Sequence, residues 1–307
     1  MSERVFEMFA GYGGGSFALK KANIDYTCVG FSEIYNYAIQ CFEQNHKGNN
    51  YGDCRHIDPS NLPDFDLLLG GFPCQPFSEA GKHGGELDTR GTLFHDIIRI
   101  AKVKQPKRML LENVKGLTFA NHRDTFSTIL SALDKIGYTV YWKVLNSRDY
   151  GIPQSRERVF FVCIRKDIDF EFQFPPKEPL GLFLKDIVEG GSDEVLVSIA
   201  RRNKNRSKHQ HLGLPYGTFP KEYHLVHNKD LGVSYAVKSA RHEFMVGTID
   251  HENVRNLTPK ECFRLMGFLD DEINLENIPK THQYALAGNG WDINLVSNLL
   301  GRMIDDD

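Results

Sequence analysis

The chain has 307 residues and a net charge of −3, with 41% apolar and 25% charged residues. These values are typical of a globular protein, and they exclude disorder, collagen and a coiled coil as descriptions of the whole chain. The sequence contains no run of about 18 apolar residues and no signal-peptide segment, so we expect a cytoplasmic protein with no membrane partner. The six cysteines form no Cys-x-x-Cys pair, which predicts reduced thiols and no metal site.

Strand and helix patterns alternate through the first 165 residues. We predict strands over 4–8, 26–31, 66–69, 108–111, 139–145 and 159–164. We predict helices over 14–21, 36–45, 93–103 and 124–136. Repeated β-α-β units with short connections indicate an α/β fold, with a doubly wound, mostly parallel sheet covered by helices. Ligands of such sheets bind at the carboxyl ends of the strands.

The pattern changes after Arg165. The proline-rich segment 174–179 resembles a linker, and a loop-rich region extends from it to about Val254. Residues 198–229 contain seven Lys or Arg against one acid, which indicates either a solvated face or a nucleic-acid contact through Arg201, Arg202 and Lys204. Beyond this region, Thr-Pro-x-Glu at 258–261 predicts a capped helix, and 292–303 predicts an amphipathic one.

A glycine-rich turn, Phe9-Ala10-Gly11-Tyr12-Gly13-Gly14, follows the first strand. It lacks the sixth glycine of Gly-x-Gly-x-x-Gly and the Lys-Ser/Thr of a P-loop. Glu33 and Asp53 follow later strand patterns, where the first can bind ribose hydroxyls and the second an exocyclic amine. A tight turn and two surface acids are the simpler interpretation of each feature alone. Together the three features predict an adenosine-type cofactor.

Three further motifs follow strands or lie on them. Cys74 stands between prolines in a polar loop, where a thiolate nucleophile is a better interpretation than a core cysteine. Glu112 follows a buried strand and can donate a proton from a cleft. Arg156 and Arg158 alternate on a strand and suit a phosphate or a base carbonyl, although solvated arginines are the alternative.

With these motifs in this order, the chain resembles the DNA cytosine-5 methyltransferases of the restriction–modification type. The matching motifs are Phe9–Gly14, Glu33, Asp53, Pro73-Cys74-Gln75, Glu112-Asn113-Val114, Gln154-x-Arg156-x-Arg158, Arg255-x-Leu257-Thr258-Pro259-x-Glu261 and Gly288-Asn289. Only residues 177–254, where this family has its variable target-recognition region, lie outside the resemblance. It implies a Rossmann-like catalytic domain over 1–176 with 284–307, and a target-recognition domain and hinge over 177–283.

The resemblance also implies the reaction, which is methyl transfer from S-adenosyl-L-methionine to C5 of a cytosine flipped out of double-stranded DNA. Cys74 would add to C6, Glu112 would hold N3 and the exocyclic amine, and Arg158 would hold the base carbonyl. Arg156 would stabilise the catalytic loop or a nearby phosphate, and residues 77–90 would close over the base. The expected DNA contacts are Ser78, Gln154, Arg201, Arg202 and Lys204.

The expected cofactor-binding residues, again from the resemblance, are Phe9, Gly11, Tyr12, Gly13, Gly14, Glu33, Ile34, Asp53, Cys54, Pro73, Leu93 and Asn289. The sequence departs from the family pattern at two places. Ile34 stands where the family often has an aromatic residue, and Gly290-Trp291 follows Gly-Asn where Ser or Ala is usual.

Other functions fit the sequence less well. The tRNA-modifying relatives carry a Cys-Phe-Thr tripeptide that is absent here, and amine methylation requires an Asp/Asn-Pro-Pro-aromatic motif that is also absent. A dinucleotide oxidoreductase lacks support without the sixth glycine, and a silent DNA-binding protein would not need Cys74, Glu112 and Arg158. We expect a monomer, and the sequence leaves open both a partner endonuclease and the DNA site that is read.

Overall fold

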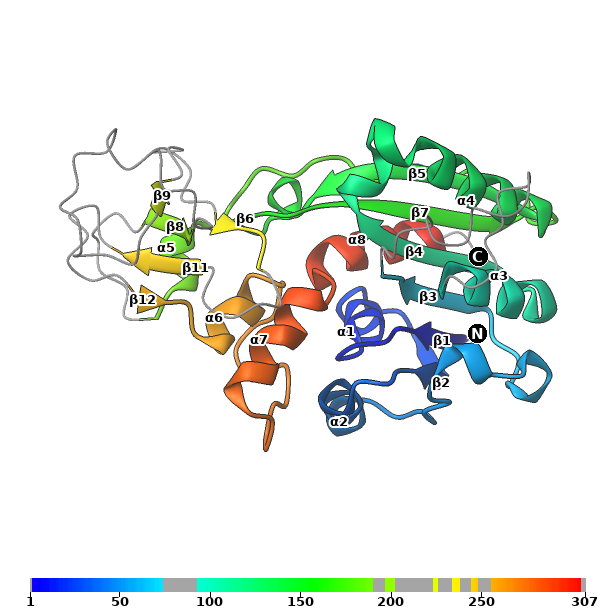
Figure 1. Ribbon diagram of the computed structural model, residues 1–307, viewed down its shortest axis with the longest axis horizontal. Coiled ribbons are helices and arrows are strands. Elements are labelled where there is room, and N and C mark those ends of the chain that lie inside the picture. The colour runs from blue at the N-terminus through cyan, green and yellow to red at the C-terminus, as the bar shows by residue number, and fades with distance from the viewer. Residues whose placement is uncertain are drawn as a thin grey trace.

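A six-stranded sheet with strand order β2-β1-β3-β4-β7-β5 forms the centre of the protein (Figure 1). The computed structural model describes residues 2–73, 93–189, 197–201, 223–225, 234–237, 244–247 and 255–304. The strands of the sheet are β1 (Glu3–Met8), β2 (Tyr26–Ser32), β3 (Leu67–Gly71), β4 (Arg108–Val114), β5 (Tyr138–Asn146) and β7 (Glu157–Arg165). Only β7 among these six runs against its neighbours, which confirms the mostly parallel sheet.

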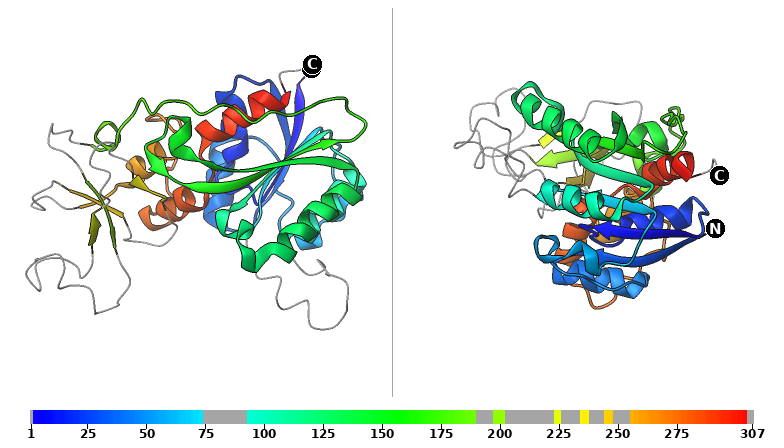
Figure 2. Two further views of the ribbon diagram at one scale, coloured as in Figure 1. Left: turned by 90° about the horizontal axis from the view of Figure 1, so that it is seen from above. Right: turned by 90° about the vertical axis from the view of Figure 1, so that its right-hand side faces the viewer.

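Helices cover both faces of this sheet (Figure 2). Its α-helices are α1 (Gly14–Lys21), α2 (Asn36–Asn45), α3 (Leu93–Lys104), α4 (Arg123–Lys135) and α8 (Ile293–Ile304). Short 3-10 helices are η1 (Cys54–His56), η2 (Pro59–Asn61), η4 (Lys115–Thr118), η5 (Ala120–His122) and η6 (Ser147–Tyr150). The predicted helices agree with these bounds to within one residue, as at α4 and α8.

The two faces of the sheet have separate apolar cores. Along β3, Leu67 and Leu69 belong to the core shared with α1 and α8, whereas Leu68 belongs to the core shared with α3 and α4. Successive side chains of a strand point to opposite faces, so a sheet covered on both sides needs apolar residues at every position. This requirement explains why the central strands have no polar alternation in the sequence.

A smaller region lies beyond the carboxyl ends of the parallel strands (Figure 1). Its elements are a sheet of β8 (Val197–Arg201), β9 (Tyr223–Leu225), β11 (Phe244–Gly247) and β12 (Arg255–Asn256), the pair β6 (Gln154–Ser155) and β10 (Ser234–Tyr235), and α5 (Leu184–Ile187), α6 (Pro259–Arg264) and α7 (Lys280–Asn289). The predicted capping box is present, because Thr258 N–H donates to Glu261 at 2.7 Å and Glu261 N–H donates to Thr258 Oγ1 at 3.2 Å. Phe263 and Phe268 pack on Tyr12, so the segment that contains α6 shares a core with α1.

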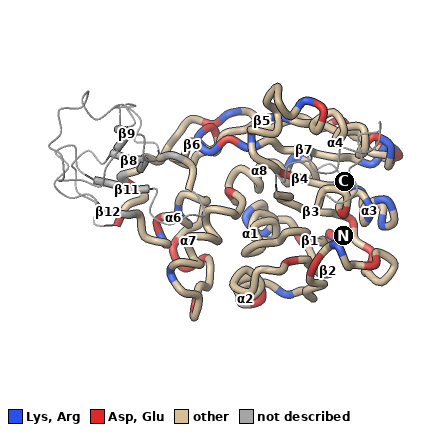
Figure 3. The backbone as a smooth tube through the Cα atoms, in the orientation of Figure 1, with Lys and Arg blue, Asp and Glu red and all other residues tan. Residues whose placement is uncertain are grey.

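Lys and Arg lie interspersed with Asp and Glu over the described elements (Figure 3). An overall charge of −3 does not attract DNA, so attraction to a polyanion must come from local cationic groups. Among the described helices, none is long and apolar enough to cross a membrane. The same ranges of the chain contain no group of three or more His, Cys, Asp or Glu side chains that could hold a metal ion.

Candidate active site

The motifs meet at one edge of the sheet because β7 runs antiparallel. The parallel strands β1, β3 and β4 end at Met8, Gly71 and Val114, at this edge. β7 begins at the same edge, where Arg158 pairs in register with Val114. The arginine motif, which lies at the start of β7, therefore comes close to the motifs that follow β1, β3 and β4.

The glycine turn after β1 has a strained backbone. Phe9 has a φ of +54° although it is not glycine, and Gly11 has a φ of +56°. A non-glycine residue in this region costs about 1–3 kcal/mol and is found mainly at functional sites. The turn delivers the chain into the N-terminus of α1, where backbone N–H groups favour negative charge.

A buried glutamate, Glu7, supports this turn through hydrogen bonds to the first residues of α1. Glu7 accepts the backbone N–H of Ser16 at 2.9 Å and that of Gly15 at 3.2 Å, and it accepts the Ser16 hydroxyl. Burial raises the pKa of Glu7 to about 7, against the lowering effect of these hydrogen bonds. Glu7 was not among the site residues expected from the sequence, although an acid flanked by apolar residues just before a glycine turn is a usable signal.

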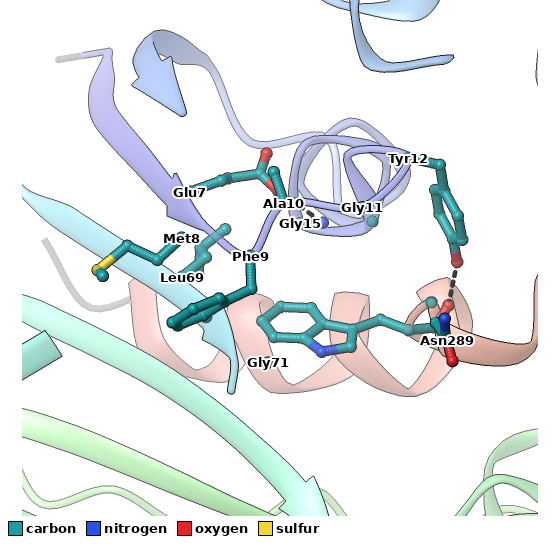
Figure 4. A pocket seen from close by; sticks show the side chains of 14 residues that line it. Glu7, Met8, Phe9, Ala10, Gly11, Tyr12, Gly15, Leu69, Gly71 and Asn289 are labelled. Carbon is teal, nitrogen blue, oxygen red and sulfur yellow. Dashed lines mark hydrogen bonds between the residues drawn. The ribbon is translucent and has the colours of Figure 1, made fainter. Parts of the chain in front are cut away.

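A pocket of about 30 Å³ lies between the turn and the segment Asn289–Trp291, and we call it the glycine-loop pocket. Phe9, Gly11, Gly14 and Asn289 line it, as expected. Tyr12 lines the pocket too, and its hydroxyl donates to the carbonyl of Trp291 (Figure 4). The hydroxyl thereby supports the segment Asn289–Trp291, and contact of Tyr12 with the cofactor stays a prediction.

Gly13 lies in the same turn and has a packing requirement of its own. A Cβ at this position would lie 2.4 Å from Cδ2 of His46, and the φ of +85° disfavours any side chain. The packing of His46 and the backbone conformation therefore both require glycine here, and contact of Gly13 with the cofactor stays a prediction.

A second pocket of about 200 Å³ contains Glu33, Ile34, Asp53, Cys54 and Leu93, and we call it the Glu33 pocket. Phe9 lines both pockets, so they adjoin at this ring. The Glu33 carboxylate accepts three backbone N–H groups, from Gly11, Ile34 and Tyr35, at 2.8–2.9 Å. These bonds fix the carboxylate at the mouth of the pocket.

The Glu33 pocket suits an adenosine group. A carboxylate has about four acceptor sites, so Glu33 retains capacity for a ribose hydroxyl after its three backbone bonds. The Arg55 side chain lowers the pKa of Asp53 to about 2, which leaves an ionised acceptor for an exocyclic amine. Ile34 is 66% exposed and offers an apolar surface beside these acids.

Glu112 and Arg158 form an ion pair at the edge of the sheet. Arg158 Nε lies 2.9 Å from Glu112 Oε1, and both side chains are mostly buried. Burial raises the pKa of Glu112, whereas Arg158, Arg156 and a hydrogen bond from Trp291 oppose this rise. The pair thus combines a carboxyl group that retains a proton more readily than usual with a fixed cation.

Arg156 has a different role from its neighbour in the motif. It is buried and donates to the carbonyls of Val237, Gly288 and Gly290 at 2.8–3.2 Å. These bonds support the loop that follows α7, whereas a phosphate could not reach the guanidinium. The expected phosphate contact is therefore corrected to a support of Gly288 and Gly290 at the end of α7, and the catalytic loop that Arg156 is expected to stabilise lies outside the described residues.

Gln154 is also buried, with none of its surface exposed. Its amide nitrogen donates to the carbonyl of Leu265 at 2.5 Å, and its amide oxygen accepts Val237 N–H at 2.8 Å. Both ends of the amide are thus occupied, because they join the segment at Val237 to the segment at Leu265. This placement corrects the expected DNA contact of Gln154.

Asn113 shows how the nucleophile motif is anchored. Its side-chain amide donates to the carbonyl of Phe72 at 2.9 Å, directly before Pro73. Pro73 is exposed and ends the described segment, while Cys74, Ser78, Arg202 and Lys204 lie outside the described residues. Arg201 ends β8, but the position of its side chain is also outside the description.

Comparisons with known proteins extend over almost the whole chain. The family model described as C-5 cytosine-specific DNA methylase matches residues 3–305. The Type II methyltransferase M.HaeII of Haemophilus aegyptius is 39% identical, over 98% of this chain and 93% of that protein. M.NgoBI of Neisseria gonorrhoeae, also a Type II methyltransferase, is 37% identical over 95% and 90%. The crystal structure of the S. pombe Dnmt2 methyltransferase shares the fold, with a TM-score of 0.70, 23% identity and coverage of 99% and 98%.

Proposed function

The chain belongs to the C-5 cytosine-specific DNA methylase family, and we propose that it methylates a flipped-out cytosine of duplex DNA through a covalent adduct with Cys74. It is a DNA cytosine-5 methyltransferase of the restriction–modification type, and its methyl donor is S-adenosyl-L-methionine. The observation that carries the proposal is the buried Glu112–Arg158 pair, at the edge where the chain enters Pro73-Cys74.

The reaction needs covalent catalysis because C5 of cytosine is a poor nucleophile. The Cys74 thiolate adds to C6 and forms a C–S bond, and the electron pair of the C5–C6 double bond moves toward C5. Bound S-adenosyl-L-methionine supplies the methyl group, which C5 takes. Loss of the C5 proton to a base and departure of the Cys74 thiolate then restore the ring. Two moderate steps replace one difficult substitution.

Glu112 and Arg158 would act on the base during addition. As Cys74 adds, negative charge develops on the ring, and the Glu112 carboxyl group donates a proton to N3, which returns to Glu112 when the ring is restored. Its raised pKa keeps this proton available. Arg158 binds the base carbonyl and stabilises the same charge, which is worth about 10²–10³ in rate for a fixed donor.

Base flipping is needed because Cys74 must reach C6 of the cytosine. Atoms C5 and C6 lie inside the stacked duplex, so a side chain at the edge of a folded domain cannot attack them there. We propose that residues 77–90, with Ser78, close over the extruded base. Residues 177–283 would read the site, with Arg201, Arg202 and Lys204 on DNA.

Both pockets would hold the cofactor. Glu33 would bind the ribose, Asp53 the adenine amine, and Ile34, Cys54 and Leu93 the faces of the adenine. Around the glycine-loop pocket, Phe9, Gly11, Gly14, Pro73 and Asn289 would enclose the remainder. We further propose that the enzyme acts as a monomer, either within a restriction–modification system or as an orphan or phage enzyme.

The decisive experiment uses duplex DNA that contains 5-fluorocytosine. Fluorine at C5 cannot leave as a cation, so the enzyme stays attached to the methylated ring. A denaturing gel should show a protein–DNA band that requires S-adenosyl-L-methionine and disappears in Cys74→Ser. Cys28→Ser is the matched control and should keep the band, because burial raises the pKa of the Cys28 thiol to about 12.

The same gel separates the rival functions. A band with tRNA and none with DNA would overturn the DNA substrate. Absence of a band with either nucleic acid, despite cofactor binding, would indicate a silent binding protein.

A further inference from the structure

Trp291 lies beside both the glycine-loop pocket and Glu112. It belongs to the connection between α7 and α8, is 9% exposed, and lines the pocket together with Phe9 and Gly71. The ring therefore forms a wall of the glycine-loop pocket.

The indole nitrogen approaches the carboxylate of Glu112 across Gly71. A Cβ on Gly71 would lie 2.7 Å from Trp291 Nε1 and 3.3 Å from Glu112 Oε2. Gly71 and Glu112 are also register partners on adjacent strands. The absence of a side chain at position 71 thus lets the indole N–H face the Glu112 carboxylate, where it lowers the pKa of that group.

The backbone that carries Trp291 is fixed on two sides. The Tyr12 hydroxyl donates to the carbonyl of Trp291, and Arg156 Nη2 donates to the carbonyl of Gly290 at 2.8 Å. Because its backbone is fixed, Trp291 holds its indole N–H in one position. A donor in a fixed position can orient a neighbouring carboxylate.

We propose that Trp291 is a positioning residue that holds the Glu112 carboxylate from the cofactor side, while Arg158 holds it from the opposite side. The inference rests on the proposed role of Glu112 as the proton donor to the base. Arg158 engages Oε1, and the indole stands beside Oε2, so the carboxyl group cannot rotate freely. One ring would then link occupation of the cofactor pocket to the orientation of the catalytic acid.

The charged groups that face Glu112 in the described part of the chain are Arg158 on β7 and Arg156 just before it. A donor to a carboxylate favours its ionised form, so loss of the indole N–H raises the pKa of Glu112. Because the acid acts in its protonated form, the alkaline limb of the rate profile then moves to higher pH.

The chain contains two tryptophans, which allows a direct test in the full-length enzyme. Trp142 lies on β5, 45% exposed and against Phe126, so Trp142→Phe leaves Trp291 as the single tryptophan, whose emission is selected by excitation beyond the tyrosine absorption band. Its emission should titrate with pH as Glu112 gains a proton, and E112Q in the same background should abolish this titration. Emission that does not titrate, or that titrates equally in E112Q, would overturn the inference.

Kinetics give the second measurement. Trp291→Phe keeps the ring and removes the donor, so we expect cofactor affinity to change by less than about threefold while kcat falls about tenfold. The alkaline limb should move upward, and Gly71→Ala should have the same effect because it separates the two groups. Trp142→Phe is the control with unchanged kcat. An unaltered kcat and pH profile in Trp291→Phe would contradict the proposal.

The two proposals fail in different ways. If E112Q methylates DNA at the normal rate although the emission titrates, the catalytic role of Glu112 is wrong, and with it the positioning role. If E112Q is inactive but the emission does not titrate, the proposed function stands and the inference about Trp291 fails.

Discussion

The ring of Tyr12 fills the space that a side chain at position 290 would need. A Cβ on Gly290 would lie 1.9 Å from Tyr12 Cε1. The φ of Gly290 is −78°, so its backbone conformation is open to any residue and packing alone requires glycine. The departure from the family pattern at this position therefore tightens the loop against α1.

This relationship predicts that Gly290→Ala destabilises the fold by about 1–3 kcal/mol, as overpacking usually does. Urea unfolding measures the change. Tyr12→Leu would make room, so the double variant should lose less stability than the two single changes added together. Strict additivity would contradict the contact.

Two arginines in one motif should respond differently to substitution by Met. Arg156→Met removes three buried hydrogen bonds from a charged donor and should cost at least about 3 kcal/mol of unfolding free energy. Arg158→Met should instead lower kcat by about 10²–10³ with a much smaller loss of stability. Thermal unfolding and single-turnover methylation separate the two effects, and the reverse pattern would reject our assignment.

Glu7 predicts a pH dependence of stability. Its folded pKa of about 7 lies above the ordinary 4.5, so the native state binds this proton more tightly than the unfolded chain. The free energy of unfolding should therefore fall as pH rises from about 4.5 to 7, by about 3 kcal/mol from this group. Glu7→Gln should remove this slope, whereas Glu43→Gln, an exposed change on α2, should keep it.

The target-recognition assignment makes a salt-dependent prediction. Replacement of Arg201, Arg202 and Lys204 by Ala should reduce the slope of log affinity for DNA against log salt by about 2–3, because each phosphate contact contributes about 0.9. Cofactor affinity without DNA should stay constant. A triple change of Lys102, Lys135 and Lys166, at the opposite edge of the sheet, is the matched control and should leave the slope unchanged.

A buried residue provides a second comparison for the same experiment. Gln154→Leu removes an amide that holds the hinge, so it should lower stability without changing the salt slope. A loss of DNA affinity at constant salt in the folded variant would restore Gln154 as a DNA contact.

The sequence by itself determined the parallel sheet, its helices and the place of the glycine turn, Glu33 and Glu112. Apolar periodicity marks each strand, and the carboxyl ends of parallel strands share one edge, so residues that follow strands must gather there. The capping box at Thr258 was equally readable, because its partners are only three residues apart.

Only the tertiary structure decided which side chains meet when they are far apart in the sequence. Arg156 and Arg158 are two residues apart, yet the antiparallel start of β7 directs one to Gly288–Gly290 and the other to Glu112. Tyr12 and Trp291 are 279 positions apart in the chain, and Trp291 reaches Glu112 across Gly71. Such contacts depend on the packing of α1 against the segment that joins α7 and α8, and no local pattern encodes which side chain fills a shared space.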